Sequence, residues 1–329
     1  MRPAQRILVL LAAAITLVLM LPQTLAPPHD LGTVTDHVGR SVPVPPRINK
    51  VYATTQAGSL LVYALNPELL LGWNVSLSPS LEFILGSPAR ELPVLGTWDQ
   101  VYKTIHLDLI AALQPDIVVH VATPDLPTLE LVQQVEEELG IPTVVVDGSL
   151  EAIPLTLRFL GELVGRTVRA DVLALYAQNI LAGLETMRAG LPAERRTVHI
   201  VGDAGRVDLP DPLRLAGIGE VNSYNQQPAD MILIIPDPIV DLRRELAKQP
   251  PPQAVSALSA GRVYEIPTVP INWLTPGSLF RLLCAEWLAQ TAYPDLYSVN
   301  LAWRLQEFME VFYEVQLSEK VAQTILRGP

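Results

Sequence analysis

The chain has 329 residues, of which 49% are hydrophobic and 17% charged, so it can build a large core and is not wholly disordered. A formal net charge of −11 argues against a nucleic-acid-binding protein, which needs a basic face to replace phosphate counterions. A single cysteine, Cys284, excludes an internal disulfide and a thiolate metal cluster. The length allows two domains of ordinary size.

Residues 1–30 have the pattern of an export signal. Arg2 and Arg6 precede an apolar run over residues 7–21, and a positive flank before an apolar core is typical of secretory signals. We therefore expect the rest of the chain to lie outside the cytoplasm, in the periplasm or at the outer face of the membrane. Pro27 would lie next to the expected cut, so cleavage and retention as an anchor both stay open.

Residues 31–148 alternate between short apolar runs and helix-like segments. The runs "KVYATT" (50–55), "DIVVHV" (116–121) and "PTVVVD" (142–147) predict strands, and "LPTLELVQQVEEELG" (126–140) predicts an amphipathic helix. Continuous apolar strands separated by helices indicate a parallel sheet that is covered on both faces. We predict that this segment forms an N-terminal lobe.

Residues 149–192 show helical periodicity over about forty residues. A mean helix has only about 11–12 residues, so one or two long helices are expected here, and we assign the segment as a rigid connecting helix. The alternation restarts over residues 193–329, with strands expected in "RTVHIVGDAG" and "ADMILIIPDP". The sequence thus predicts an α/β protein with two Rossmann-like lobes, a C-terminal helix, and a ligand cleft where strand ends of the two lobes meet.

Four sequence blocks extend this prediction. They are, in chain order, "DHVGRSVPVPPRINKVYA", "LDLIAALQPDIVV", "ALSAGRVYEIPTVPINWLTPGSLFRLLCAEWLAQTAYP" and "LQEFMEVFYEVQLSEKVAQTIL". Together they resemble the substrate-binding proteins of ABC importers for iron complexes, siderophores, haem and cobalamin, the class III proteins with a helical backbone. The resemblance implies a ligand held between two lobes, a small closing motion, delivery to an ABC permease in the membrane, and no enzymatic activity.

Two features depart from that family. The lipid-anchoring cysteine is absent, and the segment between "LAGIGEVNSYN" and "ADMILIIP" is short. An alternative is therefore an anchored, degenerate module of the same fold with a sensing or scaffolding role. A hydrolase or a nucleotide-dependent oxidoreductase is disfavoured, because neither G-x-S-x-G nor G-x-G-x-x-G occurs.

Candidate ligand-binding residues follow the predicted strands. They are Thr55, Gln56, Trp98, His120, Asp203, Asp237, Asn272 and Trp273. The His120 imidazole could bind a metal chelate or could be a buried, hydrogen-bonded histidine. Loop tryptophans such as Trp98 and Trp273 suit flat ligands, but they also plug loops over a core. Thr55 could meet an anionic ligand or simply cap a helix, and the two aspartates could instead form turns.

Histidine and carboxylate side chains show no metal-ligand spacing on one predicted element, so a pre-chelated ligand fits better than a bare metal ion, and we expect no cofactor. Glu130 begins the helix after "PDIVV", where the resemblance implies an acid that docks onto permease arginines. An acid favoured by the helix dipole is the alternative. The matching candidate in the second lobe is Asp241 or Glu245, and we take Glu245 as the docking residue. We expect a monomer that does not bind nucleic acid.

Overall fold

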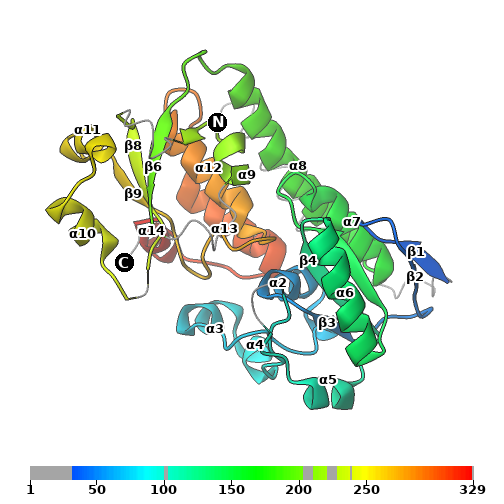
Figure 1. Ribbon diagram of the computed structural model, residues 1–329. Coiled ribbons are helices and arrows are strands. Elements are labelled where there is room, and N and C mark those ends of the chain that lie inside the picture. Colours follow the sequence, from blue (N-terminus) through cyan, green and yellow to red (C-terminus); the bar gives the residue numbers. More distant parts are fainter. Residues whose placement is uncertain (1–31, 100–102, 203–209, 221–227, 238, 328–329) are drawn as a thin grey trace.

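The computed structural model describes residues 32–99, 103–202, 210–220, 228–237 and 239–327. These residues form two lobes, each with its own parallel sheet (Figure 1). The expected fold class is therefore confirmed. The predicted export signal over residues 1–30 lies outside the described residues. Within the described ranges, no helix is both long enough and apolar enough to cross a bilayer.

Lobe 1 contains a three-stranded parallel sheet in the order β3-β4-β5, preceded by an antiparallel hairpin of β1 and β2. The strands are β1 Thr33–Thr35, β2 Ser41–Pro43, β3 Val51–Ala53, β4 Ile117–Ala122 and β5 Thr143–Asp147. The helices are α2 Gln56–Leu65, α3 Pro79–Leu85, α4 Ser87–Glu91, α5 Leu107–Leu113 and α6 Leu126–Leu139.

The alternation of side chains along β4 gives this sheet two buried faces. Val119 and Val121 belong to the main core that extends to the connecting helices, whereas Val118 packs with Tyr52 in a separate cluster that includes residues of α5 and α6. Successive side chains of a strand point to opposite faces, and both faces of β4 are apolar. The prediction of a strand covered on both sides is therefore confirmed.

The segment "DHVGR", at the start of the first of the four sequence blocks, ties the N-terminal hairpin to this sheet. The Arg40 guanidinium contacts the buried Asp36 carboxylate at 2.9 Å and donates a hydrogen bond to the Thr143 carbonyl. Gly39 between them has φ +80°, which favours glycine. His37 adds a backbone hydrogen bond of 3.0 Å to the Val145 carbonyl. These contacts fix the hairpin beside β5.

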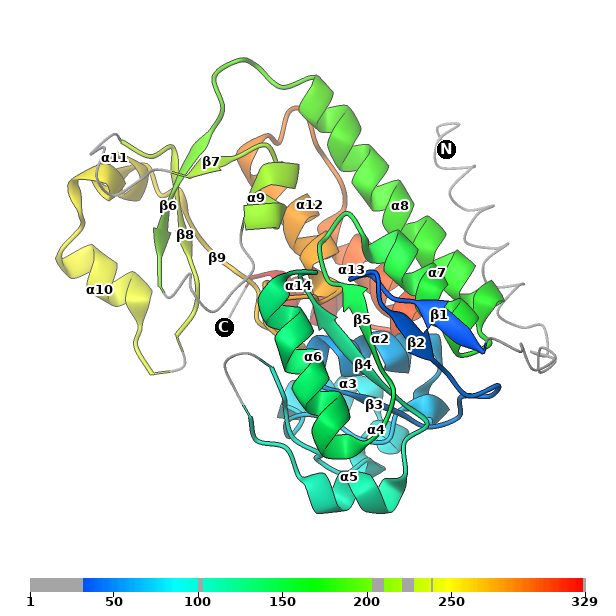
Figure 2. The same cartoon turned by 45° about the vertical axis from the view of Figure 1, so that its right-hand side comes forward.

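The connecting segment differs from a single helix, because it consists of α7 Ile153–Leu163 and α8 Thr167–Ala189. Gly165 has φ +67°, a conformation that ends α7. A Cβ atom at Gly161 would collide with the Ala170 Cβ, so the two helices pack closely after the turn. The long brace is therefore α8 alone, and a loop over residues 190–196 connects its C-terminal end to β6 in lobe 2 (Figure 2).

Lobe 2 contains a four-stranded parallel sheet in the order β7-β6-β8-β9. Its strands are β6 Thr197–Val201, β7 Gly219–Glu220, β8 Met231–Ile234 and β9 Val263–Glu265. Its helices are α9 Pro210–Leu215, α10 Leu242–Lys248, α11 Val255–Ser259, α12 Phe280–Ala292, α13 Leu301–Tyr313 and α14 Glu319–Arg327. The lobe boundaries at residues 148 and 192 stay a prediction, because the main core includes residues of both lobes and of α8.

Candidate ligand-binding site

The C-terminal strand ends of lobe 1 are turned toward lobe 2. Gly148, directly after β5, touches the loop before α12, where a Cβ atom at Gly148 would lie 3.2 Å from the Gly277 Cα. The Ser78 hydroxyl of lobe 1 also donates a hydrogen bond of 3.2 Å to the Pro270 carbonyl of the loop after β9. The residues that follow the strands of the two sheets are therefore brought to one junction, as ligand sites of open parallel sheets require.

Thr55 and Gln56 begin α2 at the end of β3. The Thr55 hydroxyl accepts a hydrogen bond of 3.2 Å from the Gly58 amide, so this side chain caps the helix in the present structure. Gln56 is the first residue of the helix and is partly exposed. Both residues lie at the lobe junction, where the backbone amides of the first helical turn could meet an anionic ligand oxygen.

His120 and Trp98 are buried side by side with this segment rather than exposed to solvent. Each side chain is 1% exposed. The Thr54 hydroxyl lies 2.6 Å from the His120 Nδ1 atom, and the Trp98 amide donates a hydrogen bond of 2.9 Å to the Thr54 carbonyl. The Lys103 ammonium covers the Trp98 ring at 4.0 Å from its centre. The structure thus joins His120 and Trp98 through Thr54, beneath the surface of the junction.

The His120 Nε2 atom is buried and has no hydrogen-bond partner among the described residues. Burial lowers the pKa of His120 to about 4, although the charges of Asp99 and Asp125 act in the opposite direction. The imidazole is therefore neutral at pH 7. A buried polar atom without a partner costs free energy, so a ligand atom that approached Nε2 could gain a hydrogen bond or a coordination bond there.

We predict that His120 makes the protein less stable in mild acid. Its pKa is about 4 in the folded chain and 6.5 when exposed, so the unfolded chain binds the extra proton first as the pH falls. The free energy of unfolding should fall by about 3 kcal/mol between pH 6.5 and pH 4 from this group. Urea unfolding at several pH values checks this. His120→Asn should flatten the slope in that window, and an unchanged slope would contradict the assignment.

The candidates in lobe 2 make local contacts. The Asp237 carboxylate accepts hydrogen bonds from the Ile239 and Val240 amides at 2.8 and 2.9 Å, which is a turn-forming role. The Asn272 side chain accepts from the Leu274 amide at 2.9 Å. Trp273 is fully buried, and its indole donates a hydrogen bond of 3.0 Å to the Val269 carbonyl. Asp203 lies outside the described residues.

A set of contacts that we call the interlobe clamp was not predicted from the sequence. The Arg214 guanidinium of α9 holds the Glu151 carboxylate with two hydrogen bonds of 2.9 and 2.8 Å, and Asp211 accepts from the Leu150 amide at 3.1 Å. Arg281 of α12 is fully buried and donates to the Gly148 carbonyl at the end of β5. These contacts join lobe 2 to the segment that leaves the first sheet, so they fix the lobes beside the candidate site.

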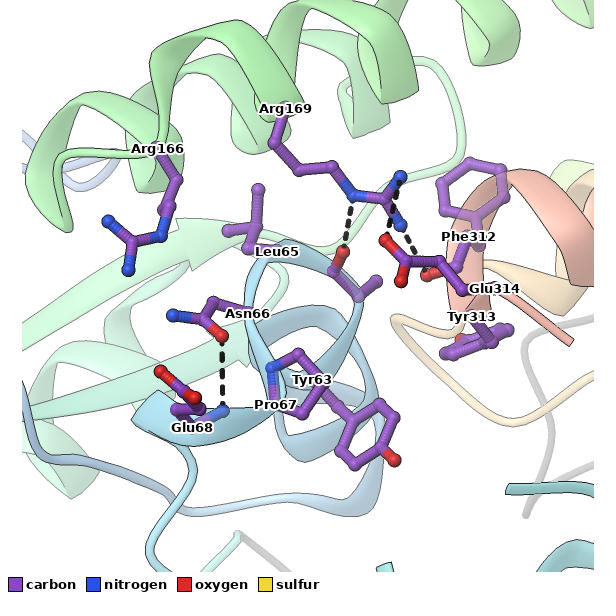
Figure 3. Close-up of a pocket in the computed structure, with 11 residues that line it drawn as sticks. Tyr63, Leu65, Asn66, Pro67, Glu68, Arg166, Arg169, Phe312, Tyr313 and Glu314 are labelled. Carbon is purple, nitrogen blue, oxygen red and sulfur yellow. Dashed lines mark hydrogen bonds and ion pairs between the residues drawn. The ribbon is translucent and has the colours of Figure 1, made fainter. Parts of the chain in front are cut away.

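A further polar cavity of about 470 Å³ lies where α2, α8 and α13 meet (Figure 3). The Arg169 guanidinium donates hydrogen bonds to the Ala64 carbonyl at 3.0 Å and to the Phe312 carbonyl at 3.1 Å, and lies 3.7 Å from the Glu314 carboxylate. The last carbonyls of a helix lack partners inside the helix. Arg169 therefore caps α2 and α13 together, and we assign it a structural role.

The two candidate docking acids are both exposed. Glu130 lies on the second turn of α6, and Glu245 lies on α10, where the Lys248 ammonium contacts its carboxylate at 2.7 Å. Each helix follows a strand of its own sheet and begins with an aspartate that caps it, Asp125 for α6 and Asp241 for α10. The described residues contain no group of three side chains able to hold a metal ion.

No protein-family profile and no curated protein matches the chain. Solved structures do match it. An ABC transporter solute-binding protein from Sulfurospirillum deleyianum superimposes with a TM-score of 0.77 at 25% sequence identity, over 90% of this chain and 99% of that protein. The molybdate periplasmic binding protein MolA of Haemophilus influenzae matches with a TM-score of 0.66 at 16% identity, over 87% of this chain and 99% of MolA.

IsdE of S. aureus, solved in complex with heme, matches with a TM-score of 0.57 at 17% identity, over 75% of this chain and 99% of IsdE. These matches span nearly the full length of each neighbour, so both lobes and the brace are shared. They bear out the resemblance carried by the four sequence blocks. The chain thus has the two-lobed fold of the ABC transporter solute-binding proteins.

Proposed function

We propose that the protein is the extracytoplasmic solute-binding component of an ABC importer. It captures an iron complex such as a siderophore or haem, or a related chelate such as cobalamin, between its lobes and delivers it to a membrane permease. The observation that supports this most directly is the match over 90% of the chain and 99% of a solute-binding protein from Sulfurospirillum deleyianum. The neighbours reported above are solute-binding proteins rather than enzymes, which agrees with a role in transport.

The residues at the lobe junction support a chelate rather than a bare ion. A bare ion takes its ligands from the protein, and no group of three such side chains exists in the described ranges. Trp98, Trp273 and His120 lie in or beside the loops that follow the strands, and aromatic groups there suit flat or bulky ligands. MolA was solved with molybdate and IsdE with heme, so the fold alone does not select between a small oxyanion and a macrocycle.

Ligand entry would use His120 and Trp98 through a local rearrangement. Both are buried in the present structure, and the unpartnered Nε2 atom of His120 is the group that gains most from a ligand acceptor or metal. Trp98 is held to Thr54 by a backbone hydrogen bond, and the Thr54 hydroxyl in turn contacts His120, so a rearrangement of this segment would act on both residues. Thr55, Gln56, Asp237 and Asn272 complete the proposed contacts.

Glu130 and Glu245 are the proposed permease contacts. Both are exposed, and each lies near the start of a helix that follows a sheet strand, one in each lobe. Exposed carboxylates in this arrangement can pair with cationic side chains of a membrane partner and set the orientation of docking. The protein would act as a monomer that presents one acid from each lobe. The comparisons give no support to the alternative of a degenerate scaffold.

A fluorescence titration tests the proposal. Haem, cobalamin and ferric siderophores are added to the purified protein, and tryptophan emission is followed with correction for ligand absorbance. We expect saturable 1:1 quenching at micromolar concentration for one of these classes. Trp98→Phe should remove much of the quenching, whereas Trp303→Phe, at a side chain that is 40% exposed on α13, should retain it. No saturable quenching across the panel would contradict capture of a chelate.

A further inference from the structure

A second concavity, the α3–α14 groove, contains none of the candidate ligand-binding residues, although Thr268 and Val269 of its lining belong to the loop after β9 that also carries Asn272 and Trp273. It has a volume of about 740 Å³ and lies between α3 of lobe 1, the loop after β9, and α14. Its lining residues are Pro79, Ser80, Phe83, Ile84, Thr268, Val269, Lys320, Val321, Thr324 and Ile325. Small-molecule sites commonly have volumes of about 300–1,000 Å³ and mainly apolar walls with a few polar groups, and this groove has both properties.

The walls of the groove are held apart by contacts behind them. Ser78, which caps α3, donates a hydrogen bond of 3.2 Å to the Pro270 carbonyl, and the Trp273 indole fixes the Val269 carbonyl at 3.0 Å. On the inner sides, Leu81 of α3 and Ala322 of α14 are buried in the main core. These contacts hold the walls of the groove in place, with Phe83 as its most exposed apolar side chain.

Phe83 is the most exposed apolar residue that lines the groove, since its side chain is 72% exposed. Leaving the Phe83 ring exposed and the Val321 side chain half-buried beside it forgoes part of the free energy of burying them. An apolar occupant would recover part of that free energy. The shape and the lining thus favour a flexible hydrocarbon chain that lies along the groove.

The charged group in the lining indicates which head group a ligand with such a hydrocarbon chain would carry. Lys320 is the one charged residue among those that line the groove, and none of them is acidic. In the described part of the chain, Lys320 is exposed and forms no ion pair, and the Ser80, Thr268 and Thr324 hydroxyls are the remaining polar side chains of the lining. An apolar groove with a single unpaired ammonium is complementary to an amphiphile with one anionic head group.

We propose that the α3–α14 groove binds an aliphatic carboxylate of the fatty-acid class. The hydrocarbon chain packs on Phe83, Ile84 and Val321, and the carboxylate pairs with the Lys320 ammonium at the rim. Because α3 belongs to lobe 1 and the loop after β9 belongs to lobe 2, a bound chain contacts both lobes at once. The proposal is independent of the chelate-binding function.

Isothermal titration calorimetry with dodecanoate, kept below its micelle concentration, tests this site. We expect saturable 1:1 binding. Lys320→Gln should weaken it about tenfold through loss of the charge-assisted contact, and Phe83→Ser should weaken it to a similar degree. The matched controls are Lys248→Gln on α10 and Leu155→Ser on α7, where the leucine is 65% exposed. Neither control should change the affinity.

Dodecyltrimethylammonium, with the same chain and a cationic head, should bind at least about tenfold more weakly than dodecanoate. Absence of saturable binding, or binding that Lys320→Gln and Phe83→Ser leave unchanged, would refute the site. Self-association in sedimentation velocity that Phe83→Ser abolishes would show instead that a second copy covers the groove. The chelate titration of the same variants should be unaffected, so failure of one proposal does not entail failure of the other.

Discussion

Arg304→Ala should lower the free energy of unfolding by about 3–5 kcal/mol. The Glu286 carboxylate of α12 is fully buried, and Arg304 Nε of α13 lies 3.0 Å from it as an ion pair without hydrogen-bond alignment. The Tyr297 hydroxyl donates a hydrogen bond of 2.6 Å to the same carboxylate. Burial raises the pKa of Glu286, and the charge of Arg304 opposes this rise. Removal of the arginine leaves the buried carboxylate with the Tyr297 hydrogen bond but without its cationic partner.

Urea unfolding measures how far Arg304→Ala lowers the free energy of unfolding. The double variant Glu286→Met/Arg304→Met should be much more stable than Arg304→Ala, because replacing a buried pair with apolar groups removes both desolvation costs. Arg158→Ala is the surface control, since Arg158 and Asp171 form an ion pair in which both side chains are exposed. Arg158→Ala should lower the free energy of unfolding by less than about 1 kcal/mol. An equally small loss for Arg304→Ala would show that the buried pair does not stabilise the helix packing.

Arg281→Ala should cost about 3–4 kcal/mol and should also loosen the two lobes. The Arg281 side chain is fully buried, and its guanidinium donates to the Gly148 carbonyl at the end of β5. Burial lowers the pKa of Arg281 to about 10, so the group remains charged at pH 7. The truncation leaves a cavity between α12 and β5 and a carbonyl without its donor. The interlobe clamp then depends on Asp211 and Arg214 alone.

The loosening of the two lobes can be measured by electron paramagnetic resonance, as the distance between spin labels at Glu130→Cys in lobe 1 and Glu245→Cys in lobe 2. Cys284 is fully buried, and burial raises the pKa of its thiol, so it should not react with the label. Arg281→Ala should broaden the distance distribution, whereas Arg243→Ala, at a residue exposed on α10, should not. An unchanged distribution together with a loss below about 1 kcal/mol would contradict the role of the clamp.

The two lobes could be predicted because their strands are continuous apolar runs between helical patterns. Each of the runs around Val118 and Leu233 became a buried parallel strand. The position of the break between α7 and α8 could not be predicted, because helical periodicity continues through Gly165 and a single glycine is tolerated within helices. Only the backbone angle of Gly165 shows that the chain turns there.

The sequence proposes candidate ligand-binding residues from their position after the strands, but it does not say how deeply each side chain is buried. The alternation of β4 places His120 on one face and Val119 and Val121 on the other, and the sequence does not say which face is accessible. Trp98 and Trp273 lie in the expected loops, but both are buried. A signal for the buried charges did exist, because Arg281 and Glu286 interrupt the apolar run "SLFRLLCAEWLA", and charges inside such a run are rarely buried without partners.

Hydrogen exchange measured by mass spectrometry tests the central claim, which is that a chelate is held between the two lobes at their strand ends. The ligand is the member of the haem, cobalamin and ferric-siderophore panel that quenches tryptophan emission most strongly. We predict slower exchange on binding in residues 52–60 of lobe 1 and residues 266–275 of lobe 2. Slowing confined to one lobe, or no slowing with any member of the panel, would contradict the account.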